Sequence, residues 1–212
     1  MDKVTPISKD LSLKKAWTIM EENNVKTLPV QDEEGKLIGL ASLSNISSTY
    51  MGVWQKDILA KSNANIEDII DTLNAKVYYK KEEKQKFIGN LVVAAMEAKD
   101  IKNYVKEGDI VILGNREDAQ ETALDCKAHL LVVTGSHKVS DKILNKAKDL
   151  GCSILVSKED TFTTSVLITQ SIPVSYIMTS SDIISFKLSN FVEDIKEVML
   201  KTRSVSYTHL TL

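Results

Sequence analysis

The stretch VKTLPVQDEEGKLIGLASLSNI, residues 25–46, decides the fold of the first part of this chain. Apolar residues gather at 27–31 and at 36–41, and an acidic turn that ends at Gly35 separates the two runs. Short apolar runs on either side of a polar turn with glycine are typical of two adjacent β-strands. We therefore predict a pair of strands here, joined by the acidic turn.

Ser42 and Asn45 follow the second strand and stand three residues apart at the start of a predicted helix. The first N–H groups of a helix have no acceptor inside the helix, so together with the Ser42 hydroxyl they can bind an anion. Asn45 lies one turn further along and can bond a ribose diol. The pair indicates a site for a ribose phosphate, and the alternative is an ordinary helix cap, which uses the same residue types.

The flanking sequence completes a β-α-β-β-α segment within residues 1–60. We predict a short strand at 4–7 and then a helix that starts at a cap on Asp10 or Ser12 and continues to about residue 20, with apolar residues at helical spacing. A second helix is predicted from residue 44 to about residue 59.

Residues 61–172 have a different pattern, in which helices alternate with strongly apolar strands. The predicted strands are 91–95, 110–113, 130–133 and 153–156, and the predicted helices are 66–73, 118–127, 139–150 and 161–169. This alternation predicts a parallel sheet covered by helices on both faces, so the fold class is α/β.

Residues 173–212 repeat the beginning of the chain. Apolar residues recur at a constant offset of 179: Val4 and Ile183, Ile7 and Phe186, Leu13 and Val192, and Met20 and Met199. The copy stops before its second strand, so we predict half of a repeat. Residues 208–212 depart from the pattern, and we expect them to be non-native or misread.

Composition excludes several classes of partner. The chain has 212 residues and a formal net charge of −2, which gives no general attraction to nucleic acid or to anionic membranes. No apolar run approaches the ~20 residues that span a bilayer, and no secretory leader is evident. Cys126 and Cys152 suit neither a disulfide framework nor a metal site. We expect a cytoplasmic protein without nucleic-acid or membrane partners.

These patterns resemble two known domain families. The first segment, with Lys26-Thr27-Leu28-Pro29-Val30 and Gly39-Leu40-Ala41-Ser42-Leu43-Ser44-Asn45, resembles a CBS domain (cystathionine beta-synthase type). The third, which starts Tyr176-Ile177-Met178-Thr179, resembles the first half of a tandem CBS partner. The middle segment is similar to a DRTGG domain. Gly114-Asn115-Arg116 and Thr134-Gly135 stand at its two signatures, but Asn115 replaces the family's Asp and Ser136 its second Gly.

The order CBS, DRTGG, CBS resembles the regulatory insert of a family II inorganic pyrophosphatase. The resemblance implies that AMP and ADP inhibit the parent enzyme, that ATP or diadenosine polyphosphates activate it, and that the DRTGG domain contributes to a homodimer. It also implies manganese or cobalt in catalytic domains that carry an Asp-His-His motif. That motif has no counterpart here, because His129, His137 and His209 are isolated. The chain alone is therefore expected to be no enzyme, with the catalytic domains as its partners.

The resemblance places an adenine nucleotide in a cleft shared by the two CBS copies. Leu28 and Pro29 offer an apolar surface to adenine, and Lys26, Thr27 and Arg203 could face phosphate. The full set of candidate residues is Thr5, Ile7, Lys26, Thr27, Leu28, Pro29, Ser42, Asn45, Ile184, Arg203 and Ser204.

Other interpretations stay open for several features. Lys26 could be a solvated surface residue, and Leu28 and Pro29 could simply pack in the core. Arg116 is expected to form an ion pair at a strand-to-helix turn, and Thr134-Gly135-Ser136 could bind an anion on backbone N–H groups. As a whole, the chain could instead be a dimerisation module without ligand sensing, or the regulatory part of another CBS-DRTGG protein.

Overall fold

The computed structural model describes residues 5–51, 55–82, 86–180, 183–184, 186 and 191–202. The first domain is a three-stranded sheet with two helices. Its elements are β1 (Ile7–Ser8), α1 (Leu13–Glu22), β2 (Thr27–Gln31), β3 (Leu37–Ser42) and α2 (Leu43–Met51). The strand order is β1-β2-β3, with β1 parallel and β3 antiparallel to β2. The predicted β-α-β-β-α order is confirmed, and α1 begins at the Ser12 cap.

The largest differences from the predictions in this domain are at the first strand and the second helix. Strand β1 starts at Ile7, later than predicted, and Val4 lies outside the described residues. The single helix predicted over 44–59 is wrong, because residues 55–57 are not helical and α3 (Ile58–Lys61) is a separate short helix. The Lys56 carbonyl accepts the Leu91 N–H of the second domain at 2.8 Å, which ties this backbone to the second domain and not to a continuing helix.

The second domain is a five-stranded sheet with the order β4-β8-β7-β6-β5. Its strands are β4 (Lys76–Tyr79), β5 (Leu91–Val93), β6 (Ile110–Leu113), β7 (Leu130–Val133) and β8 (Ser153–Val156). Its longer helices are α4 (Ile66–Leu73), α5 (Ala98–Tyr104), α6 (Glu117–Asp125), α7 (Asp141–Leu150) and α8 (Thr161–Thr169). Strands β5 to β8 are parallel, as predicted. Strand β4, which pairs antiparallel with β8 at one edge, was not predicted from the sequence.

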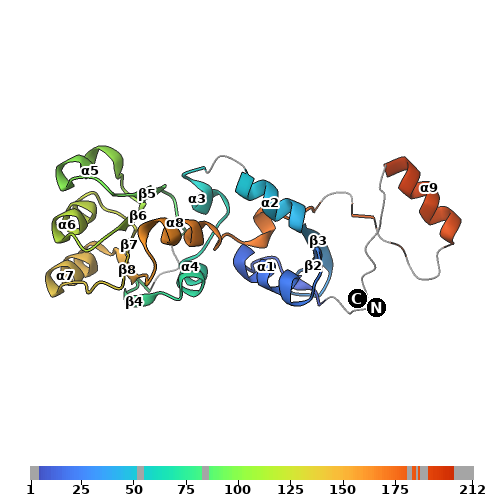
Figure 1. The fold of residues 1–212 in the computed structure, drawn as a ribbon, viewed down its shortest axis with the longest axis horizontal. Coiled ribbons are helices and arrows are strands. Elements are labelled where there is room, and N and C mark those ends of the chain that lie inside the picture. The colour runs from blue at the N-terminus through green and yellow to red at the C-terminus, as the bar shows by residue number, and fades with distance from the viewer. Residues whose placement is uncertain are drawn as a thin grey trace.

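Helices cover both faces of this second sheet, as predicted. Figure 1 shows α5, α6 and α7 on the outer face and α4 and α8 on the face toward the first domain. Helix α7 ends at Gly151, which has φ +66° and is the expected left-handed cap. Residues of β6, β7 and β8 are fully buried, which explains their unbroken apolar runs.

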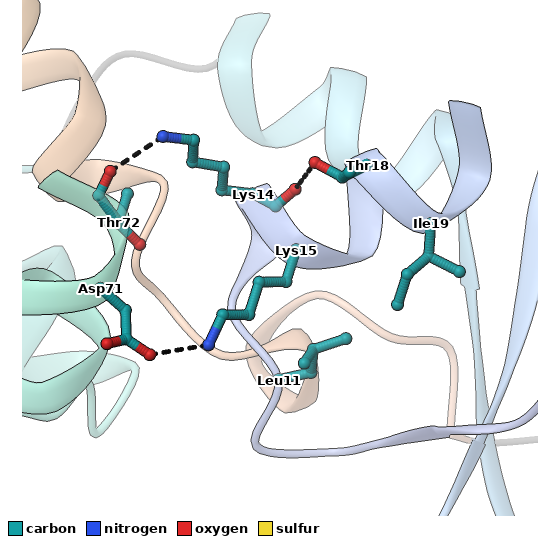
Figure 2. A pocket seen from close by; sticks show the side chains of 7 residues that line it. All are labelled: Leu11, Lys14, Lys15, Thr18, Ile19, Asp71 and Thr72. Carbon is teal, nitrogen blue, oxygen red and sulfur yellow. Dashed lines mark hydrogen bonds and ion pairs between the residues drawn. The ribbon is translucent and has the colours of Figure 1, made fainter. Parts of the chain in front are cut away.

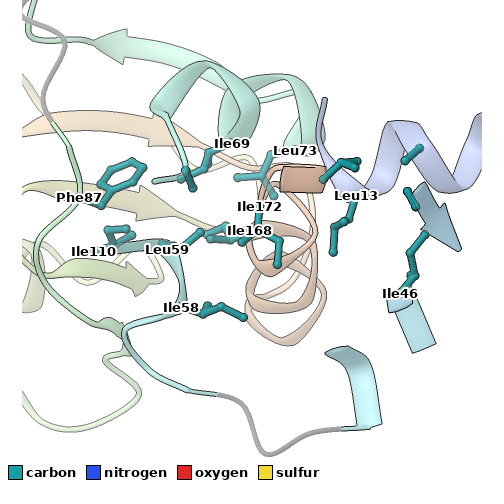
Figure 3. Close-up of a cluster of buried hydrophobic side chains, with 14 of the residues drawn as sticks. Leu13, Ile46, Ile58, Leu59, Ile69, Leu73, Phe87, Ile110, Ile168 and Ile172 are labelled. Carbon is teal, nitrogen blue, oxygen red and sulfur yellow. The ribbon is translucent and has the colours of Figure 1, made fainter. Parts of the chain in front are cut away.

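One hydrophobic core joins the two domains. It contains Leu13, Leu28 and Ile46 of the first domain together with Ile69 and Ile168 of the second, all of them at most 1% exposed. Figure 3 shows side chains of this cluster from Ile46 of α2, past Leu13 of α1 and Ile168 of α8, to Ile110 of the second sheet. A boundary filled by a shared apolar core does not favour free motion between the two domains.

The start of α1 is also hydrogen-bonded to the end of α8. The Leu13 N–H donates to the Ile172 carbonyl at 2.9 Å, and the Lys14 N–H donates to the Gln170 carbonyl at 3.1 Å. The first N–H groups of one helix and the last carbonyls near another are the groups that a helix leaves unpaired. The backbone groups at the start of α1 and after the end of α8 therefore satisfy each other's hydrogen-bonding needs across the domain boundary.

After α8 the chain returns to the first domain. We call residues 173–179 the strap; it includes the short 3-10 helix η1 (Val174–Tyr176). Its N–H groups at Val174 and Ser175 donate to the carbonyls of Leu11 and Lys9, each at 2.8 Å. Further on, α9 (Val192–Thr202) is the helix that the offset of 179 predicts from α1. Among the described residues, α9 stands apart from the first sheet (Figure 1).

Candidate functional site

Ser42 and Asn45 form a reciprocal cap at the start of α2. The Asn45 N–H donates to Ser42 Oγ at 3.1 Å, and Asn45 Oδ1 accepts the Ser42 N–H at 2.9 Å and the Ser42 hydroxyl at 2.5 Å. Two of these hydrogen bonds do not use the hydroxyl hydrogen of Ser42: the Asn45 N–H to Ser42 Oγ, and the Ser42 N–H to Asn45 Oδ1. Both remain if that hydrogen rotates toward another acceptor. The cap can therefore coexist with a bond from the Ser42 hydroxyl to a ligand.

The β2–β3 pairing brings two of the predicted phosphate residues, Lys26 and Thr27, to this cap. Thr27 lies opposite Ser42 in the register of the two strands. The Lys26 carbonyl accepts the Leu43 N–H at 2.9 Å, so this first-turn donor of α2 is already paired. Lys26 itself has an exposed side chain. The anion-binding capacity of this helix start consequently depends on the Lys26 and Ser42 side chains more than on free backbone N–H groups.

The other predicted residues are placed differently. Leu28 is 0% exposed in the shared core and Pro29 is also buried, so their contact with adenine stays a prediction. Ile7 pairs with Val30 one strand away, whereas Thr5 is exposed.

Of the residues predicted from the second copy, Ile184 is 37% exposed. Arg203 and Ser204 lie outside the described residues.

Thr179 is a neighbour of the cap that sequence reasoning missed. Asn45 Nδ2 lies 3.5 Å from Thr179 Oγ1, and the backbones of Thr179 and Leu40 exchange two hydrogen bonds of 2.9 Å. The two residues are 134 positions apart in the chain. The repeat pointed to Tyr176-Ile177-Met178-Thr179 as the beginning of a second copy, but no local pattern shows that this segment reaches Asn45.

The structure does not support an anion cradle at Thr134-Gly135-Ser136. The Gly135 N–H donates to the Glu159 carbonyl and the Ser136 N–H to the Ser157 carbonyl, each at 2.9 Å. The loops that follow β7 and β8 thus bond to each other, and these donors are not free.

Arg116 forms the expected ion pair, with Asp118 at 3.0 Å. The hydrogen bond between the two side chains raises the pKa of Arg116 and lowers the pKa of Asp118. Both groups are exposed, so this pair is a surface contact and contributes little to stability.

A pocket of about 300 Å³ lies elsewhere, between α1 and the end of α4 (Figure 2). Lys14 Nζ donates to the Thr72 carbonyl at 2.8 Å, and Lys15 pairs with Asp71 at 2.8 Å. The hydrogen bond that Lys15 donates to Asp71 raises the pKa of Lys15. None of the predicted nucleotide residues lines this pocket, which belongs to the joint between the domains.

The described residues contain neither a metal-binding cluster nor a membrane-spanning helix. No group of three or more His, Cys, Asp or Glu side chains there is arranged to hold a metal ion. None of the helices in that part of the chain is long and apolar enough to traverse a bilayer.

Family comparisons agree with the two kinds of domain. Residues 1–52 match the CBS domain family, and residues 68–171 match the DRTGG domain family. A cobalt-dependent inorganic pyrophosphatase from Clostridium perfringens is 42% identical over 207 residues, which are 98% of this chain and 38% of that protein. A probable manganese-dependent inorganic pyrophosphatase from Thermotoga maritima is 28% identical over 94% of this chain and 36% of that protein. The chain therefore spans little more than a third of these relatives.

A solved structure matches almost the whole chain. It contains the CBS and DRTGG domains of the regulatory region of the Clostridium perfringens pyrophosphatase, complexed with the activator diadenosine tetraphosphate. The TM-score is 0.90 at 42% identity, and the match covers 96% of this chain and 88% of that one. The similarity extends from the first domain through the second and into the segment that follows.

Proposed function

Because this chain belongs to the family of CBS-DRTGG regulatory regions of metal-dependent inorganic pyrophosphatases, we propose that it senses adenine nucleotides for such an enzyme. The observation that carries the proposal is the 42% identity to a regulatory region solved with diadenosine tetraphosphate. The geometry of the first domain supports it, since Ser42, Asn45 and Thr27 meet at one end of the sheet.

The proposed ligand contacts follow from the chemistry of these residues. The Asn45 carboxamide binds the ribose hydroxyls, and the Ser42 hydroxyl faces the phosphates together with Lys26 and Thr27. Pro29 and its neighbour Leu28 lie behind the adenine, and Arg203 would add a phosphate contact from the second copy. Thr5, Ile7, Ile184 and Ser204 complete the proposed wall of the site.

Nucleotides can regulate the enzyme if they bind one relative orientation of the two CBS copies more tightly than another. A ligand shifts a conformational equilibrium only by its differential affinity, and typical coupling free energies are ~1–3 kcal/mol. We propose that AMP and ADP favour an inhibited arrangement, and that ATP and diadenosine polyphosphates favour an active one. The reaction itself, hydrolysis of diphosphate with manganese or cobalt, belongs to catalytic domains outside this chain.

Calorimetric titration tests the shared cleft. AMP, ATP and diadenosine tetraphosphate are titrated into this chain and into a version that carries a complete second CBS domain. We expect weak binding to this chain and tighter binding to the longer one, because the second copy supplies part of the wall. Equal affinities would refute the shared cleft, and no binding to either protein would refute nucleotide sensing.

Replacing Asn45 with aspartate is expected to strengthen binding of adenosine by roughly two- to tenfold. A carboxylate makes stronger hydrogen bonds to ribose hydroxyls than a carboxamide does, and it also suits the start of α2. Nucleotides with several phosphates should gain less, since the new charge repels them. Calorimetry measures both effects.

Asn115→Asp is the matched control, because it adds the same charge on an exposed loop of the second domain. If both variants change adenosine affinity equally, or if Asn45→Asp weakens it, Asn45 does not contact the ribose.

We also propose that the parent protein is a cytoplasmic homodimer to which the DRTGG domain contributes. Sedimentation of this chain with and without AMP tests the dimer. It also distinguishes a nucleotide sensor from the alternative, a dimerisation module without ligand sensing. A tight dimer that is indifferent to AMP would favour dimerisation without sensing, and a monomer at all concentrations would contradict a dimer held by this region.

A further inference from the structure

We infer that Thr179, which the chain supplies after the second domain, positions Asn45 for recognition of the ribose diol. This inference rests on the proposed nucleotide site. Thr179 is exposed, so a ligand bound at the cap can reach it. Three features of the described residues support the inference: the backbone that holds Thr179, the orientation of the Asn45 carboxamide, and the route of the strap.

The backbone of Thr179 is fixed on the free edge of β3. The Leu40 N–H donates to the Thr179 carbonyl and the Thr179 N–H donates to the Leu40 carbonyl, each at 2.9 Å. Strand β3 pairs with β2 on its other side, so Thr179 acts as one added strand residue. Gly39 leaves room for this approach, because a Cβ there would lie 2.6 Å from Met178 Sδ.

The carboxamide of Asn45 is held at both ends. Its Oδ1 accepts two hydrogen bonds from Ser42, which leaves Nδ2 on the opposite side, 3.5 Å from Thr179 Oγ1. The Thr179 hydroxyl can accept from Nδ2 and still donate its own hydrogen to a ligand. A ribose diol at this place would therefore meet a donor and a hydroxyl at a fixed spacing, and a deoxyribose would leave one of them without a partner.

The strap connects this contact to the rest of the molecule. It leaves the buried Ile172 beside α8 and crosses the first domain, with hydrogen bonds to Leu11 and Lys9, before it reaches Leu40. Figure 1 shows this part of the chain, in orange, entering the first domain near α1 and α2. The strap is the opening of the predicted second CBS copy. A shift of the rest of that copy would move Thr179 and so change the position of the Asn45 side chain.

The test compares Thr179→Val with Thr179→Ser in the full chain. Valine keeps the branched shape that suits a strand edge but has no hydroxyl, whereas serine keeps the hydroxyl. Calorimetry gives the affinities for AMP and for 2′-deoxy-AMP. NMR of the free chain follows the side-chain amide signals of Asn45. The matched control is Thr18→Val, since Thr18 is an exposed threonine of α1 whose hydroxyl bonds within its own helix.

We expect the Thr179→Val variant to bind AMP about three- to tenfold more weakly, with little change for 2′-deoxy-AMP, so that the preference for ribose falls. Its Asn45 side-chain amide signals should shift, and the Thr179→Ser variant should restore both properties. An unchanged preference for ribose in Thr179→Val would overturn the inference. If the unmodified chain binds no nucleotide, the proposed function fails separately. The Asn45 signals of the free variants then decide whether Thr179 positions this side chain, and unchanged signals would also overturn the inference.

Discussion

Replacing Leu13 with alanine is expected to destabilise the CBS and DRTGG domains together, by about 2–5 kcal/mol. Leu13 is 1% exposed and lies where α1 meets α8, in the core that both domains share. Truncation leaves a cavity that neither domain can close alone. Denaturant unfolding should show one transition that moves as a whole. Hydrogen exchange should show lost protection at Val30 in the first sheet and at Ile168 in α8.

Leu200→Ala is the control, because Leu200 is 81% exposed on α9. Surface substitutions of this kind usually change stability by no more than ~0.5 kcal/mol. Two separate transitions in the Leu13→Ala variant, with only the CBS transition lowered, would contradict a shared core.

Replacing Gly39 with alanine is expected to destabilise the chain by about 1–3 kcal/mol, because the added methyl group would clash with the strap. The new Cβ would lie 2.6 Å from Met178 Sδ and 3.3 Å from the Thr179 carbonyl oxygen. Without such a neighbour, alanine in place of glycine is usually stabilising by ~0.4–1 kcal/mol. The sign of the change in the free energy of unfolding thus reports directly on the contact. AMP affinity should fall as well, since the strap holds Thr179.

A double-mutant cycle isolates this contact. In a Met178→Ala background only the Thr179 carbonyl oxygen, at 3.3 Å, stays close to the new Cβ, so Gly39→Ala should cost clearly less. Gly114→Ala serves as the control, because a Cβ at Gly114 meets nothing within 4 Å. An equal cost of Gly39→Ala with and without the Met178 side chain would show that Met178 does not pack against Gly39.

The patterns that predicted the fold well are those that local physics decides. The turn that ends at Gly35, the apolar strands of the second domain and the left-handed cap at Gly151 all follow from side chains near in sequence. The offset of 179 also located α9, since an amphipathic helix repeats its apolar face wherever it is copied.

The features that sequence analysis missed depend on contacts between distant segments. Strand β4 is short and half-exposed, so its composition does not mark it, and only its pairing with β8 makes it a strand. The helix predicted past Met51 failed because the Lys56 carbonyl bonds to Leu91.

The residues of the candidate site also fall into those that local sequence predicts and those that depend on contacts between distant segments. Ser42 and Asn45 could be found from their spacing, since a cap is local. Thr179 could not, because the strap reaches Asn45 only through the packing of residues 173–179 on the first domain. The possible anion cradle at Thr134-Gly135-Ser136 could not be judged from the sequence for a related reason. The loop after β8, distant in sequence, supplies the carbonyls that accept from Gly135 and Ser136.

An NMR titration of the full chain with diadenosine tetraphosphate tests the central claim most directly. The claim is that a nucleotide binds where the CBS cap meets the strap. We expect the backbone amide signals of Thr27, Asn45 and Thr179 to shift together and to saturate with one dissociation constant. Shifts confined to the DRTGG domain around Arg116 and Ser136, or to the pocket beside Lys14 and Thr72, would contradict it.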